Sequence, residues 1–150
     1  MRDTHTDFQT SISLNRGSVV FRIESKEMRF RPDEIQIVGE FSAPRGAYYA
    51  DYFFVFKIAG YENLLEVPAY TEGLFEVMAD LKPFLDGLKN PRLQMSSEYE
   101  SNVLFPAEYE GQPLYSFRAE LKPWINLPMI RNLVWVETMV KELNPVLVGN

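Results

Sequence analysis

The chain contains no cysteine among its 150 residues. A protein without cysteine has no disulfide, no thiolate ligand for a metal and no cysteine nucleophile. Histidine is almost as scarce, because His5 in the polar N-terminal segment is the only one. A zinc site usually takes about three or four nitrogen or sulfur ligands, and a serine nucleophile usually needs a histidine beside it. We therefore expect no metal, no cofactor and no catalytic residue.

Long hydrophobic runs and glycine-rich turns are also missing. The eight glycines are scattered, and none has the spacing of a nucleotide-binding turn. The N-terminus lacks the apolar run of a signal peptide, so a cytoplasmic protein is expected. A membrane span needs about 20 mostly apolar residues. The most apolar stretch, 124–143, does not qualify, because it is interrupted by Asn126, Arg131, Asn132, Glu137, Lys141 and Glu142.

Positive charge is scarce in the middle of the chain. The net charge is −6, and residues 51–110 hold eleven acidic side chains against only Lys57, Lys82, Lys89 and Arg92. An acidic surface does not favour the phosphate backbone of nucleic acid, so no nucleic-acid partner is expected. A protein partner with a basic surface fits this charge better.

The hydrophobic pattern predicts strands in the first half of the chain and then a helix. Alternating residues in 18–25, 27–31 and 34–41 indicate a three-stranded meander with one wet face. The run at 52–56 is apolar at every position, which is typical of a strand buried on both faces. Its partner strand covers 64–70. A helix with one apolar stripe is predicted from about 72 to 88, capped by Thr71 and kinked or divided at Pro83.

The second half is expected to repeat the plan of a hairpin followed by a helix. Strands are predicted at 92–105 and 114–121, and a helix from about 127 to 144. Residues 1–16 form a polar arm that is flexible or pairs with a sheet edge, and 17–150 form a single α+β domain. The predicted fold is an antiparallel sheet of about six to seven strands, a meander plus two hairpins, with two helices packed on one face.

One stretch resembles a known family. "DYFFVFKIAGYENLLEVPAYTEGLFEVMADLKPFL" (51–85) runs from a strand pair into an amphipathic helix, and "EMRFRPDEIQIVGEF" precedes it. Together, residues 18–88 resemble bacterial pleckstrin-homology-like domains, in which a strand pair leads into a capping helix. The resemblance implies a ligand-binding or regulatory module. The chain departs from that family after the first helix, where such folds end, because it continues from residue 89 to residue 150.

The segment "SSEYESNVLFPAEYEG" (96–111) carries the same tripeptide twice. Its candidate partner-binding residues are Glu98, Tyr99, Glu100, Glu108, Tyr109 and Glu110. In a strand, Glu98 and Glu100 share one face, and the second pair of glutamates could approach them across a hairpin. Three interpretations remain open: an exposed acidic edge that discourages aggregation, a partner-binding surface, or a cation or hydrolase site built on carboxylates.

Two further surfaces are candidates. If the apolar residues of the meander face inward, Arg22, Arg29 and Arg31 face outward and could bind phosphate groups, unless Glu24 and Glu27 neutralise them. The predicted C-terminal helix is apolar around more than one face, with Trp135 as a candidate anchor. It is expected to pack deeply on the sheet, or to form the interface of a homodimer or of a complex with a partner protein.

These features lead to three hypotheses about function. The first is a non-enzymatic, cytoplasmic, protein-binding domain, in the form of a bacterial toxin-neutralising immunity-type protein that presents its acidic hairpin to a basic surface. The second is a pleckstrin-homology-like ligand-binding or regulatory module that uses the arginine face. The third is a carboxylate-based hydrolase or metal-binding protein.

Overall fold

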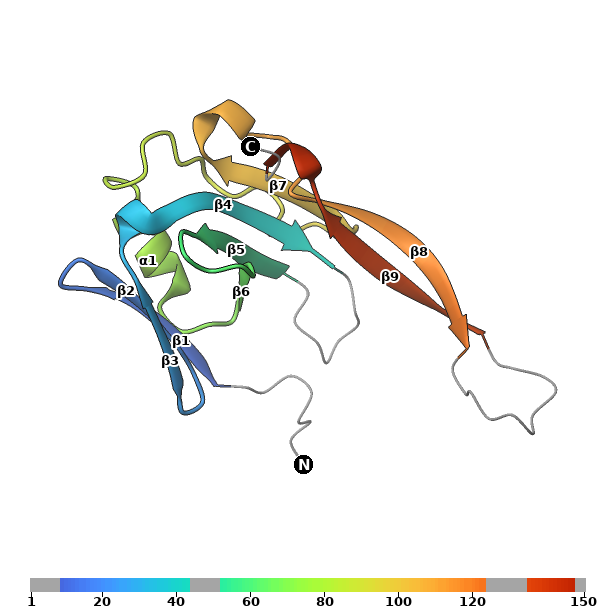
Figure 1. Ribbon diagram of the computed structural model, residues 1–150, viewed down its shortest axis with the longest axis horizontal. Coiled ribbons are helices and arrows are strands. Elements are labelled where there is room, and N and C mark those ends of the chain that lie inside the picture. Colours follow the sequence, from blue (N-terminus) through green and yellow to red (C-terminus); the bar gives the residue numbers. More distant parts are fainter. Residues whose placement is uncertain (1–8, 44–51, 124–134, 148–150) are drawn as a thin grey trace.

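The protein is β-rich. The computed structural model describes residues 9–43, 52–123 and 135–147, and within these ranges it contains nine strands, one α-helix and three short 3-10 helices (Figure 1). The strands form three antiparallel sheets with the orders β1-β2-β3, β6-β5-β4-β7 and β8-β9. The single sheet of six to seven strands with two helices on one face is therefore not found.

The N-terminal sheet is a meander, but its strands are not the three that were predicted. It consists of β1 (Thr10–Asn15), β2 (Ser18–Ile23) and β3 (Lys26–Phe30). Residues from the polar arm thus form an edge strand that pairs with β2. The strand predicted at 34–41 is present as β4 (Ile35–Ser42), but it belongs to the second sheet. The 3-10 turn Pro32–Glu34 redirects the chain between the two sheets, and side-chain alternation carries no information about which sheet a strand joins.

The central sheet is buried on both faces. It contains β4, β5 (Tyr52–Ile58), β6 (Leu65–Pro68) and β7 (Glu100–Phe105). Phe54 and Phe56 of β5 pack into one core cluster with the N-terminal sheet and the helix, whereas Phe53 and Val55 pack into a second cluster on the opposite face. The prediction that 52–56 is a strand buried on both faces is confirmed.

The helix is shorter than predicted. α1 (Leu74–Leu81) covers only eight of the residues expected to be helical, and it buries Leu74, Val77, Met78 and Leu81. Its N-cap is Gly73, not Thr71, whose hydroxyl is hydrogen-bonded to that of Thr10 at 2.7 Å. Pro83 accounts for the early end, because proline has no N–H for the helical ladder and its ring collides with the preceding turn.

The C-terminal helix predicted at 127–144 is wrong for its described part. Residues Trp135–Leu143 form strand β9, which pairs over its whole length with β8 (Tyr115–Pro123). The apolar residues of "WVETMVKEL" follow helical spacing, but the segment also contains one tryptophan and three β-branched residues, which favour a strand. The described part of the segment through which a helical homodimer was expected is therefore a strand. Residues 127–134 of the predicted helix lie outside the described ranges.

The β8–β9 ribbon leaves the body as a long arm (Figure 1). Its base is held by Tyr115 and Lys141, which both bind the Glu66 carboxylate of β6. Of the predicted strand 92–105, only β7 is a strand, and residues 89–99 form a loop. In the part of the chain that the structure describes, no helix has the length and apolar character needed to cross a bilayer.

Candidate binding site

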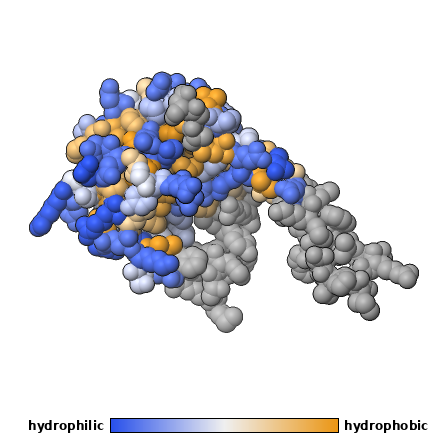
Figure 2. Space-filling view, viewed as in Figure 1, coloured by the Kyte–Doolittle hydropathy of each residue, from blue (hydrophilic) through white to orange (hydrophobic). Residues whose placement is uncertain are grey.

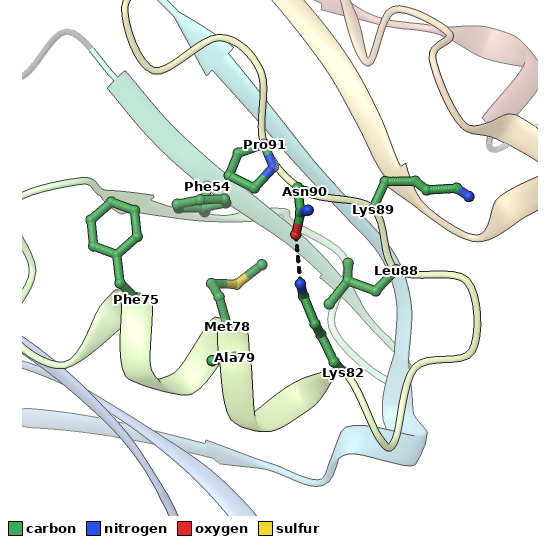
Figure 3. Close-up of a pocket in the computed structure, with 9 residues that line it drawn as sticks. All are labelled: Phe54, Phe75, Met78, Ala79, Lys82, Leu88, Lys89, Asn90 and Pro91. Carbon is green, nitrogen blue, oxygen red and sulfur yellow. Dashed lines mark hydrogen bonds between the residues drawn. The ribbon is translucent and has the colours of Figure 1, made fainter.

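An apolar pocket of about 150 Å³ lies between α1 and the loop that follows it (Figure 3). Phe54 of β5 and Met78 of α1 are its buried members, and Phe75 stands at its rim with 44% of its surface exposed. The ring of Phe75 meets that of Phe54 edge-on, with the centroids 6.0 Å apart. The complete lining is Phe54, Phe75, Met78, Ala79, Lys82, Leu88, Lys89, Asn90 and Pro91.

Helical spacing brings four of these residues together. Met78 and Ala79 lie three and four residues after Phe75, and Lys82 lies four and three residues after them, so the four share one strip of the helix surface. This strip lies beside the stripe that α1 buries in the core, and Met78 belongs to both. The short loop at 88–91 closes the pocket from the other side (Figure 3). The pocket is therefore the space that remains where a helix and a loop meet over an aromatic ring of the sheet.

The rim of the pocket is positively charged. The Lys82 ammonium crosses the pocket and donates a hydrogen bond to Asn90 Oδ1, whereas Lys89 extends away from the pocket (Figure 3). Both lysines are exposed, and neither forms a salt bridge with any residue in the described ranges. The site thus combines an apolar interior with unpaired cations at its edge.

A buried carboxylate holds the loop that forms the outer wall. Glu40 of β4 is completely buried, and its side chain accepts four hydrogen bonds. Oε1 accepts from the Tyr52 hydroxyl at 2.6 Å and from the Leu93 amide at 3.0 Å. Oε2 accepts from the Arg92 amide and from Asn102 Nδ2, both at 2.9 Å. The four donors are uncharged groups, and together they replace the water that a buried carboxylate loses.

This network connects the pocket to the central sheet. Arg92 and Leu93 directly follow the pocket residues Leu88–Pro91. Because the Glu40 carboxylate binds both of their amides, it holds the loop in place immediately after the segment that lines the pocket. Burial raises the pKa of the Tyr52 hydroxyl, and the hydrogen bond to Glu40 raises it further. The Asn102 Oδ1 atom, also buried, has no hydrogen-bond partner within the described ranges.

The four predicted glutamates do not form one surface. Glu98 and Glu100 lie at the start of β7, whereas Glu108 and Glu110 lie beyond its far end, around the 3-10 helix Ala107–Tyr109. A strand of six residues separates the pairs by about 17 Å at the usual rise per residue. All four glutamates are exposed. The described residues contain no group of three or more Asp, Glu, His or Cys side chains placed to hold a metal ion.

The two tyrosines of the repeated tripeptide attach their segments to the body. Tyr99 and Tyr109 are half-buried and pack against the second core cluster. The Tyr99 ring lies 5.6 Å from that of Phe117. Trp135, the remaining candidate, is the first residue of β9 and lies opposite Pro123; its side chain is outside the described part.

The three arginines of the alternative site are already paired with acids. Glu27 accepts from Arg22 at 2.9 Å and from Arg29 at 2.8 Å, and these bonds, with Arg29 contributing more, lower the pKa of the Glu27 carboxyl. Arg31 binds Asp33 at 3.0 Å. The arginine face is therefore a chain of exposed ion pairs, and a phosphate group would have to displace these carboxylates.

Comparison of the chain with protein-family models, with curated proteins and with solved structures gives no match. The site therefore has to be interpreted from its own geometry. Sequence reasoning missed the pocket, although one signal was present: Phe75 adds apolar surface beside the buried stripe of α1. Glu40 carried no such signal, because an acidic residue in an alternating strand is usually exposed.

Proposed function

We propose that this protein is a non-enzymatic protein-binding domain whose pocket beside α1 takes up one large apolar side chain of an acidic segment of its partner. The observation that carries the proposal is the combination of an open apolar pocket, a half-exposed Phe75 and lysines without salt bridges. A clustered apolar site rimmed by charge is typical of an interaction surface.

The size of the pocket supports a side chain as its occupant. Sites for drug-sized ligands usually enclose about 300 to 1,000 Å³. A cavity of about 150 Å³ holds one benzene ring, which is the size of a phenylalanine or leucine side chain. Burial of such a side chain contributes about 2 to 3 kcal/mol. Further affinity has to come from the charged rim, which is where the lysines lie.

The charge of the rim defines the partner. Lys82 favours a carboxylate next to the apolar side chain, and Lys89, whose side chain extends outward, adds positive charge farther from it (Figure 3). The net charge of −6 on the whole chain repels a strongly acidic protein, so we expect a short motif with only one or two carboxylates. The proposed partner segment is therefore acidic, whereas composition alone led us to expect a partner with a basic surface. The toxin-neutralising role stays a prediction from charge and size.

A peptide titration tests the proposal. The probe is a short blocked peptide with a central phenylalanine flanked by aspartates, compared with the same peptide flanked by lysines. We expect the acidic peptide to shift the NMR signals of Phe75, Met78 and Leu88, and the basic peptide to bind at least about fivefold more weakly. Shifts confined to other surfaces, or stronger binding of the basic peptide, would contradict the proposal.

A matched pair of helix variants locates the binding site. Ala79 lines the pocket from an exposed position, so Ala79→Trp fills the pocket without disturbing the core. We expect it to weaken binding of the acidic peptide at least about tenfold, which corresponds to 1.4 kcal/mol. The control is Asp80→Trp, which places the same ring on the side of α1 away from the pocket. Asp80→Trp also removes one negative charge, which can only favour binding of an acidic peptide. A similar weakening of binding in both variants would therefore exclude the pocket as the binding site.

A further inference from the structure

The β8–β9 ribbon has two outer edges, and the hydrogen-bonding pattern distinguishes them. The Asn144 amide donates to the Leu114 carbonyl at 2.9 Å, so this pair is hydrogen-bonded and the next pair, Tyr115 with Leu143, is not. The Tyr115 amide and carbonyl accordingly point away from β9, and both are bonded to Ser101 Oγ. The alternation continues along the ribbon, so odd-numbered residues of both strands direct their backbone groups outward.

The outer edge of β8 is closed at both ends. Tyr115 is engaged by Ser101, and Pro123 lies at an outward position but has no N–H. The outer edge of β9 is complete, with outward N–H groups at Trp135, Glu137, Met139, Lys141 and Leu143. Within the described ranges, none of these five groups is bonded to the backbone of another segment.

Within the described ranges, the ribbon packs on the body at its base, and no third strand pairs with it. A two-stranded ribbon alone is marginally stable in water, and a third strand or a packed face is usually required. Here the base rests on the body through Lys141 and Glu66, at 2.8 Å, while the arm extends away from it (Figure 1). Met139 is 39% exposed, and apolar residues lie among polar ones where the arm leaves the body (Figure 2). A long free edge of this kind is a site for pairing with another strand.

We propose that β9 pairs antiparallel with β9 of a second copy of this chain, around a two-fold axis at Met139. Antiparallel pairing of one strand with itself is the self-complementary contact that a symmetric dimer requires. In this register, residue 137 lies opposite residue 141 of the second copy, which sets a glutamate against a lysine on both sides of the axis. A shift of one or two residues removes both opposite-charge pairs.

The product is a four-stranded sheet in the order β8, β9, β9 of the second copy and β8 of the second copy. Its outer edges are then the β8 edges, which Pro123 protects from further pairing. The dimer therefore closes and does not extend into a fibre. This inference does not depend on the proposed pocket function, because no residue of β8 or β9 lines the pocket.

Two proline variants test which edge pairs. Met139→Pro removes an outward N–H from the free edge, and Ala119→Pro removes the equivalent N–H from the β8 edge, while neither breaks a hydrogen bond inside the ribbon. We expect light scattering to show a concentration-dependent dimer for the unmodified chain and for Ala119→Pro. Met139→Pro is expected to raise the dimer dissociation constant at least about tenfold. Circular dichroism of both variants shows whether each retains its fold.

Cross-linking tests the register without dependence on folding of the proline variants. The chain has no cysteine, so a single introduced thiol reports only on its own position. Residues facing each other in a hydrogen-bonded antiparallel pair have Cα atoms about 5.5 Å apart, which is within disulfide range. We expect Met139→Cys to form a disulfide-linked dimer under mild oxidation and Ala119→Cys not to. A monomer at all concentrations, equal cross-linking of both variants, or a dimer that Ala79→Trp disrupts would overturn the proposal.

Discussion

At the scale of single residues, Glu40 explains how a loop is fixed over the central sheet. A buried ionised group without a counterion is costly unless hydrogen bonds replace its water. Glu40 meets this condition through four donors that come from three different segments of the chain. The carboxylate therefore links β4, β5 and β7 to the loop that forms the pocket wall.

Replacement of this carboxylate is expected to destabilise the protein. In Glu40→Gln, the amide NH₂ faces groups that are themselves donors, so at least one of them loses its acceptor. We expect a loss of about 2 to 4 kcal/mol in the free energy of unfolding, measured by urea denaturation. Hydrogen exchange of the Arg92 and Leu93 amides should become faster. Glu62→Gln, an exposed control, should change neither quantity, and equal effects of the two variants would refute the role of the network.

At the scale of elements, the joint between β1 and α1 depends on Gly73. The Ile12 amide donates to the Glu72 carbonyl at 2.8 Å, and the Glu72 amide donates to the Thr10 carbonyl at 3.2 Å. These bonds bring the chain before α1 against the edge of the N-terminal sheet. Gly73 then starts the helix with φ at +84°, and a Cβ atom there would lie 2.3 Å from the Ile12 carbonyl oxygen.

Alanine at this position tests the joint. Gly73→Ala suffers both the strain of a positive φ and a collision with backbone that two hydrogen bonds hold in place. We expect a loss of about 3 kcal/mol or more in the free energy of unfolding. Gly60→Ala is the matched control, because its φ is +86° and nothing lies within 4 Å of the added Cβ. It should cost only about 1 to 2 kcal/mol. Thermal unfolding of both variants compares their losses of stability. Equal losses would show that the backbone around residue 73 moves to accommodate the added Cβ atom.

At the scale of the whole molecule, two buried tyrosines donate hydrogen bonds to carboxylates of the central sheet, Tyr52 from within that sheet and Tyr115 from the ribbon. Tyr52 donates to Glu40, and Tyr115 of the ribbon donates to Glu66 of β6 at 2.6 Å. Burial is the larger cause that raises the pKa of each hydroxyl, and the hydrogen bond to a carboxylate is the second. Both hydroxyls therefore keep their protons in the folded state at a pH at which the unfolded chain has lost them.

The stability of the protein should consequently decline at high pH. Below the unfolded tyrosine pKa of about 10, the folded and unfolded states hold equal numbers of these protons. Above it, the folded state binds more protons, so the free energy of unfolding falls by up to about 1.4 kcal/mol per pH unit for each tyrosine. Urea denaturation across this range measures the slope. Tyr52→Phe with Tyr115→Phe should flatten it, whereas Tyr61→Phe, at an exposed position, should leave it unchanged.

Side-chain pattern alone predicts several of the local elements. The apolar run of β5, the alternating strands β2 and β3, and the buried stripe of α1 follow directly from side-chain pattern. The exposure of the four glutamates of the repeated tripeptide also agrees with their chemistry. In these segments, the burial of each residue depends mainly on its own polarity.

The remaining features cannot be predicted from local pattern, because they depend on partners that are distant in the sequence. The apolar residues of 135–143 follow helical spacing, and cross-strand pairing with β8 makes the segment a strand instead. Glu40 is buried because donors from residues 52, 92, 93 and 102 converge on it. The pocket exists because α1 and the loop at 88–91 meet over Phe54, a contact that no local pattern encodes.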